Sequence, residues 1–299
     1  MYDLIIIGAG PAGITAAVYA ARKKMDFLVI TGDIGGQAAY SGDIENYTGY
    51  QFITGPELAQ KFEEHMRKYD ISVKEGEEVI AVKSLSGAIV IKTNKTEYSC
   101  KTVIIASGKR SKELGVPGEK EFKNRGLTYC ATCDGALFAK KDVAVIGGGN
   151  SALDAALQLI KIANKVYLIN NASGLGGDLI MRQKVETANN VVVYNDSTVS
   201  EVSGDQMVRA IKIRRMEKEE NLSVQGVFVE IGLVPNAGFI KNVEKNSRGE
   251  IKINLRNETN IPGIFAAGDV TDVVEKQIII AAGEGSKAAL SAFRYLAQH

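Results

Sequence analysis

Two cysteines three positions apart are the first residues in this 299-residue chain whose type and spacing suit a chemical role. They stand in the run Cys130-Ala131-Thr132-Cys133-Asp134-Gly135. On a turn or at the start of a helix, this spacing brings two sulfurs within bonding distance, and a helix N-terminus lowers the pKa of a thiol. Such a pair is a redox dithiol, half of a zinc site, or a coincidence.

Zinc is disfavoured by the scarcity of other ligands. A structural zinc site takes four Cys or His ligands, and the chain otherwise offers only Cys100, His65 and His299, none in a second paired motif. Cys100 ends a strand-like segment and is expected to be a buried structural thiol. His65 falls in a helical pattern and is expected at a helix surface. We therefore predict a redox dithiol and no metal site.

Asp134 is the only acidic residue of the cysteine motif. A carboxylate directly after a reactive cysteine is a candidate for exchanging a proton with a thiol. The competing interpretation of Asp134 is a helix N-cap. We predict the catalytic set Cys130, Cys133 and Asp134.

The elements that position these residues occur twice. Residues 4–30 align without a gap with residues 143–169, and each copy has an aliphatic run, a glycine turn, an amphipathic helical stretch and a second aliphatic run. This pattern predicts two βαβ units with parallel strands and right-handed crossovers. The predicted fold class is therefore α/β, with two Rossmann-like, doubly wound domains.

Each glycine turn has the spacing of a dinucleotide-binding loop, G-x-G-x-x-G/A. The first glycine permits a tight turn, the second lets a pyrophosphate approach backbone N–H groups, and the third position lets the helix lie close to the strand. The helix N-terminus adds a partial positive charge. One such turn is often a plain strand-to-helix connection, but two in matched context predict two nucleotide sites, formed by Gly8, Gly10, Pro11, Ala12 and Gly13 and by Gly147, Gly149, Asn150, Ser151 and Ala152.

The composition of the chain excludes some classes of binding partner. The chain has 36 Lys and Arg against 35 Asp and Glu, so it lacks the basic excess of a nucleic-acid binder. No apolar run exceeds about six residues, far short of a membrane span, and the start shows no basic region with a cleavage site. We expect no nucleic acid, no membrane insertion, no signal peptide and a cytoplasmic location.

Two nucleotide sites and one dithiol suggest an electron relay, because a flavin accepts a hydride and passes two electrons to a disulfide. The order of motifs resembles the low-molecular-weight thioredoxin reductases, the class II FAD-dependent pyridine nucleotide-disulfide oxidoreductases. The stretches 226–236 and 276–293 also resemble the reductase part of alkyl hydroperoxide reductase flavoprotein, whose additional N-terminal redox domain we expect this protein to lack. The resemblance rests on 8–13 (GAGPAG), 35–37 (GGQ), 130–135 (CATCDG), 147–152 (GGGNSA), 263–269 (GIFAAGD) and 276–283.

The resemblance implies an FAD domain of residues 1–112 and 241–299, with a nucleotide and dithiol domain of residues 113–240 inserted into it. It also implies a homodimer and hinges at 108–118 and 234–238. In one domain arrangement Cys133 faces the flavin; in the other the nicotinamide does, and Cys130 meets the partner protein. Asp33 is a further candidate for the FAD ribose. The FAD contacts that the resemblance implies are, besides the first glycine turn, Gly35, Gly36, Gln37, Asn46, Gly108, Gly268, Asp269, Lys276, Gln277 and Ile278.

The electron donor is where the sequence departs from the family. Members that use NADPH carry a basic cluster after the last strand of the second repeat, because guanidinium groups match the 2′-phosphate. Here that stretch, Asn170–Gly176, has no basic residue, and Arg182 is expected to lie beyond the loop. NADPH is therefore disfavoured. NADH is favoured, with Asn170 at the ribose position, and reduced ferredoxin or another carrier is the alternative.

The leading functional hypothesis is a flavoprotein that reduces thioredoxin or a glutaredoxin-like protein through Cys130 and Cys133. A second enzyme hypothesis has a separate small redox protein that feeds a peroxiredoxin as the partner. A hypothesis from another class is a flavin and dithiol redox sensor without steady turnover.

Overall fold

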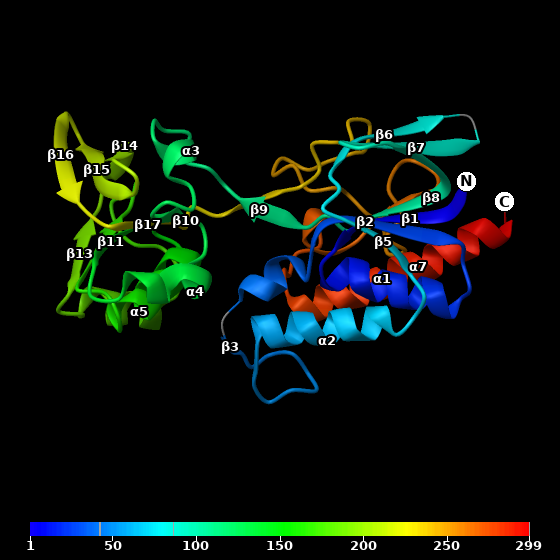
Figure 1. Cartoon of the computed structure of the whole chain (residues 1–299), viewed down its shortest axis with the longest axis horizontal. Coiled ribbons are helices and arrows are strands. Elements are labelled where there is room, and N and C mark those ends of the chain that lie inside the picture. The colour runs from blue at the N-terminus through cyan, green and yellow to red at the C-terminus, as the bar shows by residue number, and fades with distance from the viewer. Residues whose placement is uncertain (42, 86, 299) are drawn as a thin grey trace. The chain divides into compact units, whose positions relative to one another are not determined.

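The computed structural model describes residues 1–41, 43–85 and 87–298 (Figure 1). The chain folds into two compact units: unit 1 comprises Met1–Arg110 and Val234–His299, and unit 2 comprises Ser111–Leu233. The sequence predicts that the inserted domain ends at residue 240, whereas in the structure unit 2 ends earlier, at Leu233. The difference has a physical reason: Ala237 and Ile240 are buried in the core of unit 1, and Asn236 is hydrogen-bonded to Ser107.

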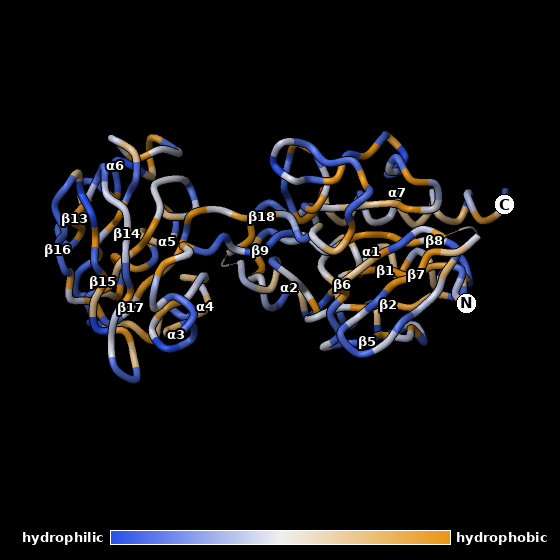
Figure 2. The backbone as a smooth tube through the Cα atoms, turned by 90° about the horizontal axis from the view of Figure 1, so that it is seen from above, coloured by the Kyte–Doolittle hydropathy of each residue, from blue (hydrophilic) through white to orange (hydrophobic). Residues whose placement is uncertain are grey.

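Unit 1 is built on a sheet whose centre is hydrophobic along most of its strands (Figure 2). Alternate residues of the first strand point to opposite faces: Leu4 and Ile6 join the core under the helices, while Ile5 and Ile7 join the second core. The neighbouring strands are, in order, β5 (Ser72–Glu75), β2 (Phe27–Ile34), β1 (Tyr2–Ala9), β8 (Glu97–Ile105), β7 (Ala88–Thr93) and β6 (Val79–Leu85), and β19 (Ile264–Ala266) also pairs with β8.

The helices of unit 1 have clear local causes. Pro11 stands at the first position of α1, where its missing N–H costs nothing. Thr54 and Glu57 form a capping box at the next helix. The last helix packs along α1, and its buried face is rich in alanine. These helices are α1 (Pro11–Arg22), α2 (Gly55–Arg67) and α7 (Ile278–Gln298), with short elements η1 (Gly36–Tyr40), η3 (Gly268–Val270), β3 (Asp43–Ile44) and β4 (Ile53–Thr54).

Unit 2 has a fully parallel five-stranded sheet, in the order β10 (Leu127–Thr128), β17 (Gly226–Val229), β11 (Asp142–Ile146), β12 (Lys165–Ile169) and β13 (Val191–Tyr194). A separate antiparallel sheet packs on the same core through its apolar face. That sheet consists of β14 (Ser197–Gly204), β15 (Val208–Arg215) and β16 (Lys218–Ser223), and the helices are α3 (Glu119–Phe122), α4 (Ala131–Asp134), η2 (Gly135–Phe138), α5 (Asn150–Ile160) and α6 (Leu179–Glu186).

The two units repeat one topology. Leu4 pairs with Phe27 in unit 1, and Val143 pairs with Val166 in unit 2, so the aligned residues have the same parallel register. The strand order β5-β2-β1-β8-β19 corresponds to β13-β12-β11-β17-β10. One difference is that the last strand of this order, β19, follows its unit's other strands in the chain, whereas β10 precedes them. The predicted fold class is confirmed.

The two chain segments at the unit boundaries pair with each other. They form the two-stranded sheet of β9 (Lys109–Ser111) and β18 (Leu233–Pro235). The expected hinge segments 108–118 and 234–238 therefore begin as one paired ribbon and not as two independent linkers. In the described part of the chain, none of the helices combines the length and apolar character needed to cross a membrane.

Candidate functional site

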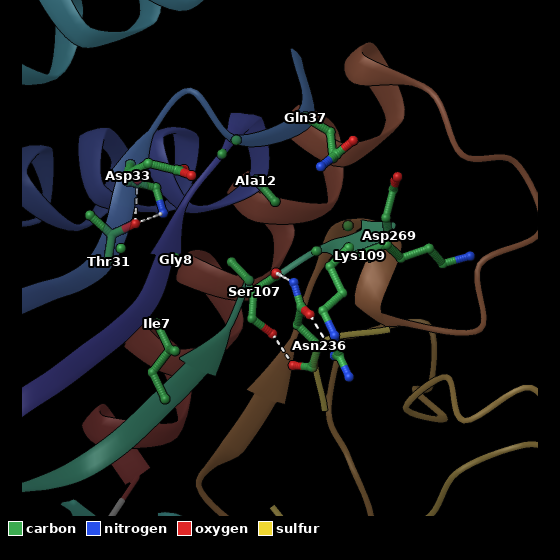
Figure 3. Close-up of a pocket in the computed structure, with 18 of the residues that line it drawn as sticks. Ile7, Gly8, Ala12, Thr31, Asp33, Gln37, Ser107, Lys109, Asn236 and Asp269 are labelled. Carbon is green, nitrogen blue, oxygen red and sulfur yellow. Dashed lines mark hydrogen bonds between the residues drawn. The ribbon is translucent and has the colours of Figure 1, made fainter. Parts of the chain in front are cut away.

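A cleft of about 830 Å³ opens in unit 1, where β1, β2, β8 and β19 end (Figure 3). The carboxyl ends of parallel strands are where nucleotides bind in doubly wound sheets, and this volume suits a cofactor. Among the described side chains none caps the N-terminus of α1, whose N-cap is Gly10. The first-turn N–H groups therefore face the cleft as donors for a phosphate.

Most of the predicted FAD contacts meet in this cleft. Asp33 lies there as well, at the end of β2, where Thr31 Oγ donates to its carbonyl oxygen at 2.5 Å. A glycine turn and an acidic side chain at the end of the second strand fit FAD. The predicted residues that line the cleft are Gly8, Gly10, Pro11, Ala12, Gly36, Gln37, Gly108, Gly268, Asp269, Lys276, Gln277 and Ile278.

Three predicted FAD contacts do not line the cleft but shape it. A Cβ at position 13 would lie 1.8 Å from Gly8 O, so Gly13 lets α1 approach the strand, the role predicted for the third glycine. Gly35 has a positive φ of 95° and donates its N–H to Ala9 O at 2.8 Å. Asn46 Nδ2 donates to Gln277 Oε1 at 3.1 Å and so holds that cleft residue.

A buried ion cluster lies beside the cleft, and no sequence pattern predicts it. The Glu250 side chain is 2% exposed, and its carboxylate lies 3.0 Å from Lys109 Nζ and 3.3 Å from Lys276 Nζ. Burial raises the pKa of Glu250, but hydrogen bonds from Asn246 and Lys109 and the charge of Lys276 outweigh burial and lower it to about 2. Burial also raises the pKa of Asp269, which lines the cleft with both lysines. No local motif joins residues so far apart in sequence.

In unit 2, Cys130 and Cys133 form a disulfide with their Cα atoms 5.4 Å apart. Cys130 is the N-cap of α4, and the Cys133 N–H donates to Cys130 Sγ at 3.1 Å. The spacing thus places both sulfurs at the start of a helical turn, as the sequence predicts. Cys133 is exposed and Cys130 half-buried, so both are within reach of a reaction partner.

The other candidate ligands lie elsewhere. Cys100 is buried, and burial raises the pKa of its thiol to about 12. His65 is exposed on α2, beside Tyr69. His299 lies outside the described residues. The placement of Cys100 and His65 matches the structural roles expected for them.

Asp134 is held by a neighbour that the sequence does not single out. The Thr128 hydroxyl donates to the Asp134 carboxylate and accepts the Cys130 N–H at 3.2 Å. Asp134 is the last residue of α4, and its side chain makes no capping hydrogen bond to the η2 turn that follows. Cys130 is the N-cap of α4, and Asp134 occupies the N-cap position of η2 without a side-chain capping bond, so its carboxylate bonds to Thr128 and caps neither helix.

The second glycine turn also opens a helix. Gly149 is the N-cap of α5, and no described side chain caps that helix. A loop from the end of β12 covers part of the turn: the Gly176 N–H donates to Gly148 O at 2.7 Å, and the Asp178 N–H donates to Asn150 Oδ1 at 2.8 Å. Asn150 therefore fastens this loop to the turn.

The expectation that Asn170 offers hydrogen bonds to a ribose needs correction. Asn170 is 2% exposed. Its Nδ2 donates to Ala172 O, Gly174 O and Asn195 Oδ1 at 3.0, 2.9 and 3.0 Å, and its Oδ1 accepts the Ala172 N–H at 3.3 Å. The hydrogen-bonding groups of the Asn170 amide are therefore engaged in holding the loop.

Arg182 lies on a helix beyond that loop, as the sequence predicts, but its side chain reaches back to the loop. This helix is α6, and Nη1 of Arg182 donates to Leu175 O at 3.1 Å, because the side chain turns back along the helix. Its Nε is buried and has no hydrogen-bond partner within the described residues. Arg182 thus supports the underside of the loop, which itself carries no basic residue.

The sequence model of one family, described as pyridine nucleotide-disulphide oxidoreductase, matches residues 2–285. The chain belongs to this family. It is 42% identical over 298 residues to an NADH dehydrogenase of Bacillus subtilis (99% of this chain, 58% of that one). It is also 42% identical over 299 residues to an alkyl hydroperoxide reductase subunit of Staphylococcus epidermidis (99% of this chain, 59% of that one). The chain therefore spans less than two thirds of the length of these relatives.

Solved structures of similar proteins cover 98–100% of the chain. Thioredoxin reductase of Lactococcus lactis superposes with a TM-score of 0.89 at 34% identity, covering 100% of both chains. That of T. acidophilum gives 0.85 at 37% identity, covering 98% of both. A ferredoxin-flavin thioredoxin reductase of Clostridium acetobutylicum gives 0.56 at 30% identity, covering 100% of this chain and 99% of that one. These comparisons confirm the family that the sequence motifs indicate.

Proposed function

We propose that this protein passes two electrons from NADH through FAD to the Cys130–Cys133 disulfide and on to thioredoxin or a similar small redox protein. The observation that carries the proposal is the disulfide at the start of α4, with Asp134 held beside it by Thr128. FAD, when bound, supplies two-electron acceptance from a hydride donor and transfer to a disulfide. The residues lining the cleft of unit 1 would hold it.

The two cysteines of the chain then carry out thiol–disulfide exchange with the partner protein. A thiolate of the reduced pair attacks one sulfur of the partner's disulfide and forms a mixed disulfide. The second cysteine attacks the sulfur of the first, which restores the Cys130–Cys133 bond and releases the partner as a dithiol. Two electrons and two protons pass to the partner. Asp134 takes the proton from the second cysteine, and the Thr128 hydroxyl holds that carboxylate in place.

NADH is proposed as the donor on two observations. The loop Asn170–Gly176 has no basic residue that would bind a 2′-phosphate, and a relative at 42% identity is named NADH dehydrogenase. A ferredoxin-fed reductase is the second candidate, supported by the loop fastened over the second glycine turn and by the ferredoxin-flavin neighbour. The homodimer and the cytoplasmic location remain predictions.

The deciding experiment is anaerobic bleaching of the flavin absorbance by NADH, NADPH and reduced ferredoxin in parallel. NADH is expected to bleach it fastest, and steady reduction of thioredoxin is then followed with NADH. Equal rates with NADPH would overturn the donor assignment, and bleaching by ferredoxin alone would establish the second candidate. Bleaching without any partner turnover would favour a sensor over a reductase.

A further inference from the structure

Glu230 joins the dithiol turn to the second glycine turn. It follows β17 directly, and its N–H donates to Ile146 O at 2.7 Å. A Cβ at Gly147 would lie 2.2 Å from Glu230 O, so the glycine turn presses against this backbone. The Glu230 carboxyl accepts a hydrogen bond from the Ala131 N–H. That N–H belongs to the peptide that follows Cys130, so the carboxyl lies one peptide away from the disulfide.

The dithiol turn has a second anchor of the same kind. The Thr132 hydroxyl donates to Gln158 Oε1 at 3.1 Å, and Gln158 Nε2 donates to Asp154 Oδ2 at 2.8 Å. Both residues between the cysteines are thus bonded to groups outside α4. The two anchors bring the carboxylates of Glu230 and Asp154 to the same end of the sheet of unit 2.

The surroundings of Glu230 are acidic. Burial raises its pKa to about 7, the Ala131 N–H opposes the rise, and the negative charge of Asp154 on α5 adds to it. The titratable groups of α4 and its N-cap, once the disulfide is reduced, are Cys130, Cys133 and Asp134. Tyr129, just after β10, donates its hydroxyl to Glu119, and the turn Gly147–Gly149 has no titratable side chain. The Glu230 carboxyl therefore gains or loses its proton near neutral pH.

We propose that Glu230 is a positioning residue of the Cys130–Cys133 couple: its carboxyl holds the Ala131 N–H, and its negative charge restrains ionisation of the Cys130 thiol. The proposal rests on the redox role proposed for this dithiol. Reduction of the disulfide takes two electrons and two protons and yields two thiols, one of which must lose its proton before it attacks. A neighbouring carboxylate disfavours that thiolate, and a protonated one does not.

The test measures thiol ionisation in the reduced full-length protein, without donor or partner, so it does not depend on the activity proposed above. Iodoacetamide alkylation is followed from pH 5.5 to 9, and mass spectrometry of peptides separates Cys130, Cys133 and Cys100. In Glu230→Gln the amide oxygen still accepts the Ala131 N–H, but the charge is gone. Cys130 of this variant is expected to react roughly three- to tenfold faster than wild type at pH 8 and within about twofold at pH 6.

Two further variants keep the proposal falsifiable. Glu186→Gln removes an exposed carboxylate elsewhere in unit 2, and its profile should overlay wild type. Asp154→Asn removes the negative charge that raises the pKa of Glu230. Glu230 should then ionise at a lower pH, and the slowing of Cys130 alkylation should begin at that lower pH. This variant provides the test if Glu230→Gln does not fold. Buried Cys100 should stay unreactive and reports unfolding. A constant ratio of rates for Glu230→Gln and wild type at every pH, or a Glu186→Gln profile like that of Glu230→Gln, would overturn the proposal.

Discussion

The Thr128 hydroxyl joins two parts of the dithiol turn: it donates to the Asp134 carboxylate and accepts the Cys130 N–H at 3.2 Å. A hydroxyl has one donor and two acceptor sites, so it can make both bonds at once. Thr128 is buried at the end of β10, which makes its position rigid. The orientation of the Asp134 carboxylate is therefore set by a residue outside the cysteine motif.

The first prediction concerns Asp134 and this hydroxyl. Asp134→Asn should slow thiol exchange with the partner by about 10²–10⁴-fold, because the proton acceptor is lost. Thr128→Val keeps the side-chain volume but removes the donor, and should slow exchange by about tenfold. Both rates are measured in single turnovers of the reduced protein with oxidised thioredoxin. An unchanged rate in Asp134→Asn would remove Asp134 from the mechanism.

The second prediction concerns the cysteines. Cys130→Ser and Cys133→Ser should each abolish partner reduction, because the exchange needs both sulfurs, and each should retain bound flavin, because the cleft lies in unit 1. Cys100→Ser is the matched control and should retain turnover, since Cys100 is a buried thiol whose pKa is raised to about 12. The measurements are thioredoxin reduction and flavin absorbance. Partner reduction by either single variant would disprove the two-cysteine mechanism.

The third prediction concerns donor choice. Asn171 and Ala172 are exposed on the loop that follows β12. Replacing both by arginine adds two groups that bind a 2′-phosphate, and should improve kcat/KM for NADPH relative to NADH by about ten- to a hundredfold. The same two substitutions to glutamine are the control and should leave the ratio within about twofold. If neither nucleotide supports turnover in any variant, the ferredoxin-fed alternative gains support.

The sequence predicted what depends on local pattern. The two βαβ units and the role of Gly13 follow from periodicity and spacing within about 30 residues. The sequence did not single out Glu230 or Glu250, because their partners come from chain segments distant in sequence. It did not single out Thr128 either, because the short strand that carries this residue has no motif of its own. Nothing in their neighbourhood marks them as different from other polar residues.

Asn170 shows a different limit of sequence reasoning. Its position at the end of β12 predicts contact with a ribose, and the position is correct. The direction of its amide depends on the loop carbonyls and on Asn195, which compete for its hydrogen bonds. A polar residue at the right place in a fold therefore predicts a ligand contact only if its hydrogen-bonding groups are not already bonded to other parts of the chain.

The fourth prediction follows from this network. Asn170→Ala leaves several buried polar groups unpaired and should lower the free energy of unfolding of unit 2 by about 1–3 kcal/mol. It should also loosen the loop from the second glycine turn and speed hydrogen exchange at the Gly176 amide. Asn171→Ala is the matched control, since Asn171 is exposed. Equal exchange at Gly176 in both variants would contradict a role for Asn170 in holding the loop.

The fifth prediction is a pH dependence set by Glu250. Its pKa in the folded chain is about 2, below that of a free glutamate. The ion cluster therefore stabilises the fold fully above the ordinary pKa of glutamate, and this contribution is lost as the pH falls toward 2. Glu250→Gln leaves Lys109 and Lys276 without their anion and should cost roughly 3 kcal/mol at pH 7, because a buried pair is broken.

The deficit should shrink below pH 4, where wild type loses the same interaction. Thermal unfolding of both proteins between pH 3 and 7 measures it, with exposed Glu244→Gln as the control. A Tm difference that stays constant over this range would mean that the charge of Glu250 contributes nothing to stability. Because both lysines and Asp269 line the cleft, the same substitution should also weaken FAD retention, measured as flavin released on gel filtration at pH 7.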